Sequence, residues 1–178
     1  MDVFLGDISW ETSYSLPGEG LQPRVRADLS LDWPTWSQTS YRSWSIGESP
    51  DELPEVVIEV ALRIQRLAER PAAESVLAVL PAESPSIGAG SLVRSSTTIE
   101  EVHNEDANDG VRWAVEATYE GSISLDESLL ENPASLEPVV EVLTGWISST
   151  LVRLADLPLV FFPPDPPDQS QRAGSAGD

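Results

Sequence analysis

The chain has 178 residues with 30 acidic and 10 basic side chains, which gives a formal net charge of −20. Lysine and cysteine are absent and the single histidine is His103, so disulfides, Schiff-base lysines and phosphate-loop lysines are excluded. The acidic excess also disfavours binding to nucleic acid or to anionic membranes, because both carry negative phosphates.

The N-terminal part of the chain is predicted to form three strands. Alternate residues of the segment 7–15 share one face, with Ile, Trp, Thr and Tyr on it. Residues 25–33 alternate strictly between apolar and polar side chains, which is typical of a half-buried strand. Pro34 ends this strand, and a third strand is predicted over residues 39–47.

A long helix is predicted next, over residues 50–70. Ser49 suits the N-cap, Pro50 the first helical position, and Glu52 completes a capping box. Pro71 marks the end of the helix. The apolar residues that recur at helical spacing are Leu53, Val56, Val57, Val60, Ile64, Leu67 and Ala68.

The second half of the chain is predicted to repeat this order. A short apolar run at 75–80 and the segment 91–103 are expected to be strands. Residues 111–125 alternate without interruption between apolar and mainly polar side chains, which is the strongest strand pattern in the chain. A second long helix is predicted over residues 132–156, and Pro158 closes it.

Two predicted βββα units indicate a two-layer α+β sandwich. The strands would form a mainly antiparallel sheet with both long helices on one face, which leaves the other face polar. An internal βββα duplication is an alternative origin of this order. Residues 1–162 are expected to form a single domain, and residues 163–178, rich in Pro and Asp, are expected to be a disordered acidic tail.

No spacing of residues selects a catalytic or metal site. His103 is followed by Glu105, Asp106 and Asp109, and this segment is interpreted as a solvated hairpin turn, with a weak cation site as the alternative. Gly88 and Gly90 lie too close together for a dinucleotide loop. The sequence therefore predicts no catalytic residue, no bound metal and no cofactor.

Surfaces that could meet a partner are acidic or aromatic. Trp36 follows Pro34 in a predicted turn and is the best exposed tryptophan candidate. The apolar segment 157–162 is expected to pack along a sheet edge, with pairing to another chain as the alternative. The predicted partner-binding residues are Trp36, Glu100, Glu101, Glu105, Asp106, Asp109, Glu116, Glu120, Phe161 and Phe162.

These observations favour a non-catalytic acidic module that binds a basic protein partner. Small acidic α+β proteins without an evident active site include secretion chaperones and toxin-neutralising immunity proteins, an analogy of architecture and charge alone. One alternative is a self-assembling structural component, which would form a homo-oligomer. Another is a small-ligand-binding protein or enzyme with a Trp-lined cavity. No signal peptide or membrane span is read in the sequence, so a cytoplasmic location is expected.

Overall fold

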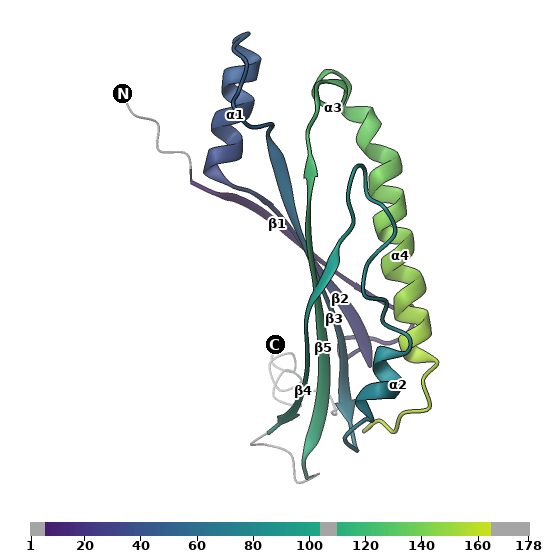
Figure 1. Cartoon of the computed structure of the whole chain (residues 1–178). Coiled ribbons are helices and arrows are strands. Elements are labelled where there is room, and N and C mark those ends of the chain that lie inside the picture. The colour runs from purple at the N-terminus through teal and green to yellow at the C-terminus, as the bar shows by residue number, and fades with distance from the viewer. Residues whose placement is uncertain (1–5, 104–109, 165–178) are drawn as a thin grey trace, which may run out of the picture.

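The computed structural model describes residues 6–103 and 110–164. It contains a five-stranded antiparallel sheet in the order β1-β2-β3-β5-β4, with helices packed against it (Figure 1). The predicted fold class, an α+β sandwich with a mainly antiparallel sheet, is confirmed. In the part of the chain that is described, no helix is long and apolar enough to cross a membrane.

The sheet twists strongly, so that β1 runs at a wide angle to β5 (Figure 1). Four of its strands lie where the sequence predicts them, apart from small differences at their ends. The strands are β1 (Ile8–Ser15), β2 (Val25–Trp33), β3 (Glu55–Leu67), β4 (Val93–Val102) and β5 (Arg112–Ser124).

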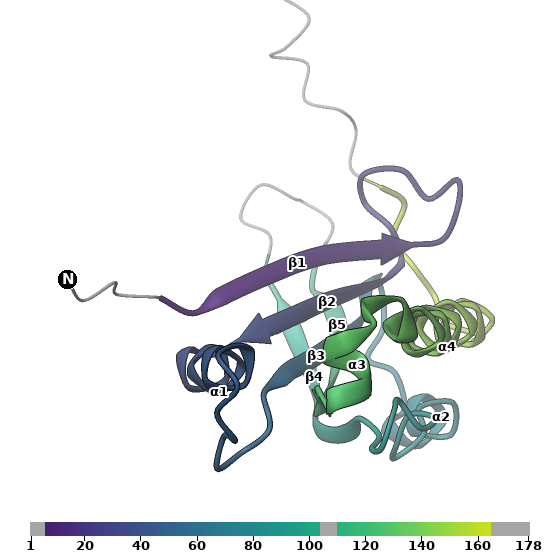
Figure 2. The ribbon, with the colours of Figure 1, turned by 90° about the horizontal axis from the view of Figure 1, so that it is seen from above.

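Two long helices and several short ones complete the fold. α4 lies along one face of the sheet, whereas α1 follows β2 at one end of the sheet (Figure 2). The helix that the sequence predicts near the C-terminus is confirmed, and it consists of a 3-10 turn followed by α4. The helices are α1 (Thr35–Ser45), α2 (Ala73–Leu77), α3 (Glu127–Glu131), the 3-10 helix η1 (Pro133–Leu136) and α4 (Glu137–Ala155).

The helix predicted over residues 50–70 is wrong, because this segment forms the central strand β3. Positions four apart, such as Val60 and Ile64, fit a helical stripe and a strand face equally well. Ile58 and Leu62 decide between the two, since both are buried although they lie off the predicted helical stripe. The segment is also rich in Val and Ile, which favour strands.

Two predicted strands are helices instead. Residues 39–47 lie mostly in α1, and residues 75–80 overlap α2 and the turn after it. Val76 in α2 and Leu80, which follows the turn after α2, are both buried in the core. The described elements therefore do not repeat a βββα order, and the predicted duplication is not present in them.

Tertiary hydrogen bonds hold α1 in its place. The Asp7 carboxylate accepts hydrogen bonds from the backbone N–H and the hydroxyl of Thr35, each at 2.8 Å, and so caps the first turn. The buried Ser37 hydroxyl donates to the carbonyl of Glu55 and accepts from its N–H. Local sequence does not predict these contacts, because they join residues far apart in the chain.

Replacing Asp7 with asparagine is expected to lower the melting temperature at pH 7. The two hydrogen bonds from Thr35 hold the pKa of the Asp7 carboxyl below its ordinary value of 3.8. A lowered pKa in the folded state stabilises the protein above pH 3.8, and this contribution is lost as the pH falls below that value.

The difference in melting temperature between wild type and Asp7→Asn should therefore shrink as the pH is lowered from 7 towards 3, when both are followed by circular dichroism. Glu48→Gln, which neutralises an exposed acid beyond the other end of α1, is the control. A difference that stays constant over this pH range would contradict the capping role of Asp7.

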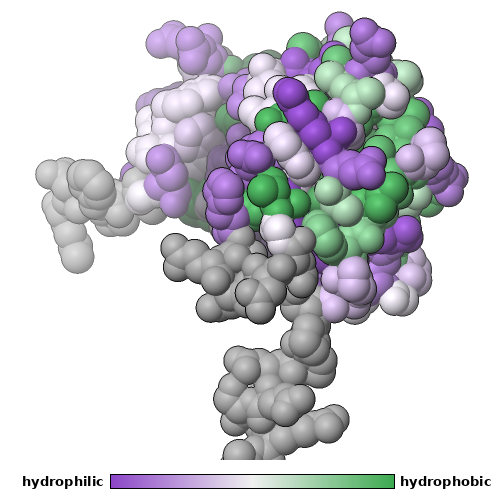
Figure 3. Space-filling view, turned by 90° about the horizontal axis from the view of Figure 1, so that it is seen from below, coloured by the Kyte–Doolittle hydropathy of each residue, from purple (hydrophilic) through white to green (hydrophobic). Residues whose placement is uncertain are grey.

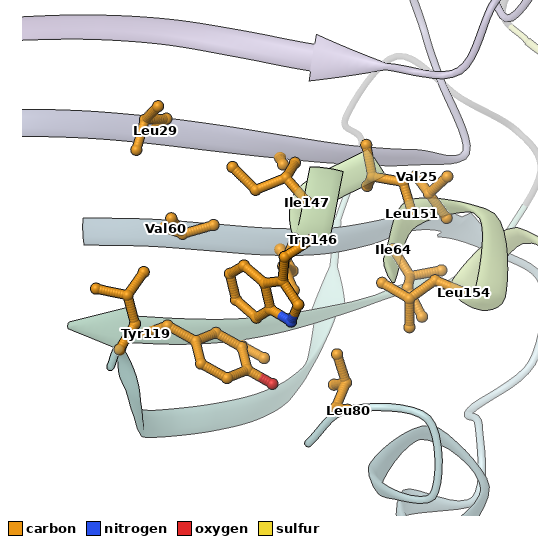
Figure 4. Packing of buried hydrophobic residues seen from close by; sticks show 14 of the residues in the cluster. Val25, Leu29, Val60, Ile64, Leu80, Tyr119, Trp146, Ile147, Leu151 and Leu154 are labelled. Carbon is orange, nitrogen blue, oxygen red and sulfur yellow. The ribbon is translucent and has the colours of Figure 1, made fainter. Parts of the chain in front are cut away.

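A continuous apolar core lies between the sheet and α4 (Figure 4). Trp146 packs edge-to-face on Tyr119, with ring centroids 5.0 Å apart. The segment between α2 and β4 covers β5 on the same face of the sheet, beside α4, and the hydroxyl of Tyr119 donates to the carbonyl of Pro81 at 2.8 Å. The buried residues of this segment are Leu80, Ile87 and Leu92, and Val76 of α2 joins them in the core.

The segment 157–162 packs against its own chain, as the first of the two interpretations predicts. Phe161 forms an isolated antiparallel bridge with Leu67, at the end of β3. The N–H of Ala68 donates to the carbonyl of Val160 at 2.9 Å, and the N–H of Phe162 donates to the carbonyl of Arg66 at 2.8 Å. The segment thus pairs with the backbone at the end of β3.

Candidate functional site

An apolar groove opens between the β1 side of the sheet and the N-terminal half of α4. Its volume is about 310 Å³, and none of the side chains that line it is charged. Four strands, β1, β2, β3 and β5, supply its floor, and α4 supplies one of its walls. The lining residues are Trp10, Thr12, Tyr14, Leu29, Leu31, Val56, Ile58, Ile123, Leu125, Leu136, Val139, Val140, Leu143 and Thr144.

The groove exists because α4 covers only part of the apolar face of the sheet. Neighbouring strands are about 4.8 Å apart and a helix is about 10 Å wide, so one helix covers roughly two strands. The segment between α2 and β4 covers the β5 side. In α4 the buried positions begin only at Leu143, so its first turns and the strand β1 leave apolar surface uncovered.

Large apolar side chains at the groove remain exposed to solvent. Trp10 on β1 and Val140 on α4 each keep 53% of their surface exposed. Exposed apolar side chains that gather at a concave surface are typical of binding sites, whereas single exposed apolar residues scattered over a protein are not. The hydroxyl of Thr144 donates to the carbonyl of Val140 at 2.9 Å, so it is satisfied within its own helix.

Exposed acidic side chains lie close in sequence to residues that line the groove. Glu137 and Glu141 are exposed on α4, each directly after a residue that lines the groove, and Glu131 is exposed at the end of α3. None of the arginines lines this groove. An apolar floor with an acidic border favours an apolar ligand that carries basic groups.

The open face of the sheet holds part of the predicted partner-binding set. This face carries Glu100 on β4 and Glu116 and Glu120 on β5. The neighbours of each glutamate along its strand point to the opposite face of the sheet. Arg63 lies between two of them, with guanidinium nitrogens 3.4 Å from Glu100 and 3.3 Å from Glu116. This face is mixed in charge rather than uniformly acidic.

The remaining predicted residues lie in other places. Glu101 is exposed on β4, 4.0 Å from the ring of the exposed His103. Trp36 is exposed on α1, near the start of β3, whereas Phe161 and Phe162 are half-buried beside the end of that strand. The residues Glu105, Asp106 and Asp109 lie outside the described residues.

The predicted set therefore does not form one continuous site. A Trp-lined cavity is one of the alternatives that the sequence leaves open, but apart from that none of the residues that line the groove is predicted as a site residue. Sequence alternation places Trp10 and Tyr14 on the apolar face of β1, but it gives no sign that this part of the face stays uncovered. Among the described residues, no cluster of three or more His, Cys, Asp and Glu side chains could hold a metal ion.

Comparison with protein-family models, with curated proteins and with solved structures finds no match to this chain. The functional argument therefore rests on the geometry and charge of the chain itself.

Proposed function

We propose that this protein is a non-catalytic, chaperone-like module that binds an apolar helix of a basic protein partner in the groove between β1 and α4. The observation that carries the proposal is the uncharged groove with Trp10 and Val140 exposed at its rim. The absence of cysteine is consistent with a reducing compartment such as the cytoplasm.

A helix fits the shape of the uncovered surface. In a two-layer sandwich the next helix would lie beside α4, above β1 and β2, and residues of these three elements line the groove. Amphipathic helices bind such grooves through apolar anchors spaced three or four residues apart. The lining offers few polar groups to a reacting substrate, which favours binding of an apolar segment over catalysis.

The charge of the chain specifies the kind of helix. With a net charge of −20 and Glu137 and Glu141 beside the groove, basic residues flanking the apolar anchors would be attracted. Opposite charges accelerate association, and salt weakens their attraction. The partner is thus expected to bind more tightly at low salt than at high salt.

The proposal is tested with two matched substitutions on α4. Val140→Asp places a charge in the groove, whereas Val152→Asp places the same charge at a residue that does not line it, and the two valines are 53% and 47% exposed. A photo-crosslinking amino acid at position 10 would capture partners in the source cell. We expect a basic protein, crosslinked through a helical segment and lost in Val140→Asp alone.

Two outcomes would overturn the proposal. One is that no protein is crosslinked from position 10 at low salt. The other is that Val140→Asp and Val152→Asp, both folded by circular dichroism, retain the same partners with the same affinity.

A further inference from the structure

The strand β1 leaves one row of backbone hydrogen-bonding groups without a protein partner. It is the first strand of the sheet, and it pairs along its whole length with β2 in a register without a bulge. On its other side no strand pairs with it in the described part of the chain (Figure 2). An open row of this kind is a template for a further strand.

The register of the sheet identifies which backbone groups face the open side of β1. The N–H of Gln65 donates to the carbonyl of Arg24, so the even-numbered residues of β2 turn their backbone groups towards β3. The odd-numbered residues of β2 therefore turn theirs towards β1, where they lie opposite its even-numbered residues. The residues of β1 whose N–H and C=O groups point to the open side are thus Ser9, Glu11, Ser13 and Ser15.

The strand β4, at the other edge of the sheet, is protected against such pairing. A bulge interrupts its register between Arg94 and Ser96, and Glu100 and Glu101 place two charges near its end. The segment before β4 pairs with its first residues, since the N–H of Arg94 donates to the carbonyl of Ala82 at 2.9 Å. Bulges, charges and covering segments are the usual means of preventing edge pairing, whereas β1 has no bulge, no proline and one charged residue.

β1 is also the least charged strand of a strongly acidic protein. Its one charged side chain is Glu11, whereas each of the other strands has at least three. The hydroxyls of Ser9 and Ser13 donate to the carboxylates of Asp32 and Asp28, the acids beside them on β2. The end of the sheet where β3 ends is less uniform, because hydrophilic and hydrophobic side chains lie next to one another there (Figure 3). Two copies that each carry a net charge of −20 would therefore meet with least repulsion along β1.

We propose that β1 pairs antiparallel with β1 of a second copy of this chain, which joins the two five-stranded sheets into one. The pairing is symmetric, with Thr12 opposite Thr12 of the second copy. In this register Trp10 lies opposite Tyr14 of the other copy and Glu11 lies opposite Ser13, so aromatic residues meet and no two acids face each other. A register centred on Glu11 would instead bring two carboxylates together. Each pair uses both open edges, so association stops at a dimer.

This dimer is separate from the proposed helix-binding function. A strand joins in the plane of the sheet, whereas the groove lies above that plane, between β1 and α4. Salt distinguishes the two kinds of association. It screens the repulsion between two acidic copies and should tighten the dimer, whereas it should weaken the binding of a basic partner.

Single cysteines test the register, because the chain has no cysteine of its own. The backbone groups of Thr12 face β2, so Thr12 and its counterpart would form a pair with Cα atoms about 4.5 Å apart, which is close enough for a disulfide. Thr12→Cys is expected to form an intermolecular disulfide under mild oxidation. Thr97→Cys is the control, at an exposed threonine on the other edge strand, and should form little of it.

A proline tests the backbone hydrogen bonds. Ser13→Pro removes one N–H from the open side of β1, and edge strands tolerate proline where the N–H faces solvent. Ser13→Ala is the control, because it loses the hydroxyl that binds Asp28 but keeps the N–H. In sedimentation velocity, wild type and Ser13→Ala are expected to be dimers, and Ser13→Pro is expected to raise the dissociation constant about tenfold or more.

Three results would overturn the proposal. The first is a wild-type chain that stays monomeric at every protein and salt concentration. The second is a dimer whose dissociation constant is the same in Ser13→Pro, folded by circular dichroism, as in Ser13→Ala. The third is a dimer in which Thr12→Cys is crosslinked no more than Thr97→Cys, since this would place the interface elsewhere.

Discussion

Replacing Trp146 with alanine is expected to lower the free energy of unfolding by about 3–5 kcal/mol, as for other buried aromatic residues. Trp146 is 6% exposed, and its ring packs edge-to-face against Tyr119 between α4 and the sheet. Removing the indole would open a cavity that this rigid interface cannot fill. Small domains have total stabilities of about 5–15 kcal/mol, so the loss is a large fraction of the whole.

Trp146→Phe serves as the control, because it keeps an aromatic ring against Tyr119. The indole Nε1 is buried and has no hydrogen-bond partner in the described residues, so phenylalanine loses no hydrogen bond there. Its cost should be clearly smaller than that of alanine in urea unfolding. Equal losses for the two variants would contradict the packing described for Trp146.

Replacing Leu62 with asparagine is expected to cost about 3–5 kcal/mol, since an apolar contact is lost and an amide is buried without partners. Leu62 is 2% exposed in the middle of β3, the central strand of the sheet. If the segment were a helix with the apolar stripe predicted from the sequence, this position would lie off the stripe and tolerate a polar residue. Urea unfolding of this variant thus tests the strand assignment.

Ala61→Asn is the matched control, one residue away on the opposite face of β3. Ala61 lies opposite Asp28 and Thr118 on the open, polar face, so asparagine there should cost less than about 1 kcal/mol. A large loss for Ala61→Asn with a small one for Leu62→Asn would mean that the faces of β3 are reversed.

Two hollows in the surface differ in polarity. The groove is lined by uncharged side chains, whereas the pocket at the end of β3 is lined in part by Arg63, Arg66 and Arg112. The net charge of −20 does not describe either hollow by itself, because charges act over about 8–10 Å at physiological salt.

Some features follow from the sequence alone. The alternation of residues 25–33 and 111–125 predicts the strands β2 and β5, since a period of two admits no helical reading over such lengths. The C-terminal helix is likewise evident from its apolar spacing and its flanking prolines. These elements suffice for the fold class, because an amphipathic sheet and an amphipathic helix bury each other.

Other elements depend on contacts that the sequence does not display. The segment that forms β3 contains apolar residues at a spacing shared by helix and strand, so only pairing with β2 and β5 decides its structure. α1 forms where Asp7 and the backbone of Glu55 bind its first turns, although its sequence has few strong helix formers.

The sequence by itself determined the charge of this protein, its fold class and the residue types that it lacks. The tertiary structure alone decided where the surface of the protein is hollowed. The groove exists because α4 is too narrow to cover β1, and the arginine pocket exists because a bulge in β3 meets Arg112 and the segment at Phe162. Both depend on distances between segments far apart in the chain, which no local pattern of residues encodes.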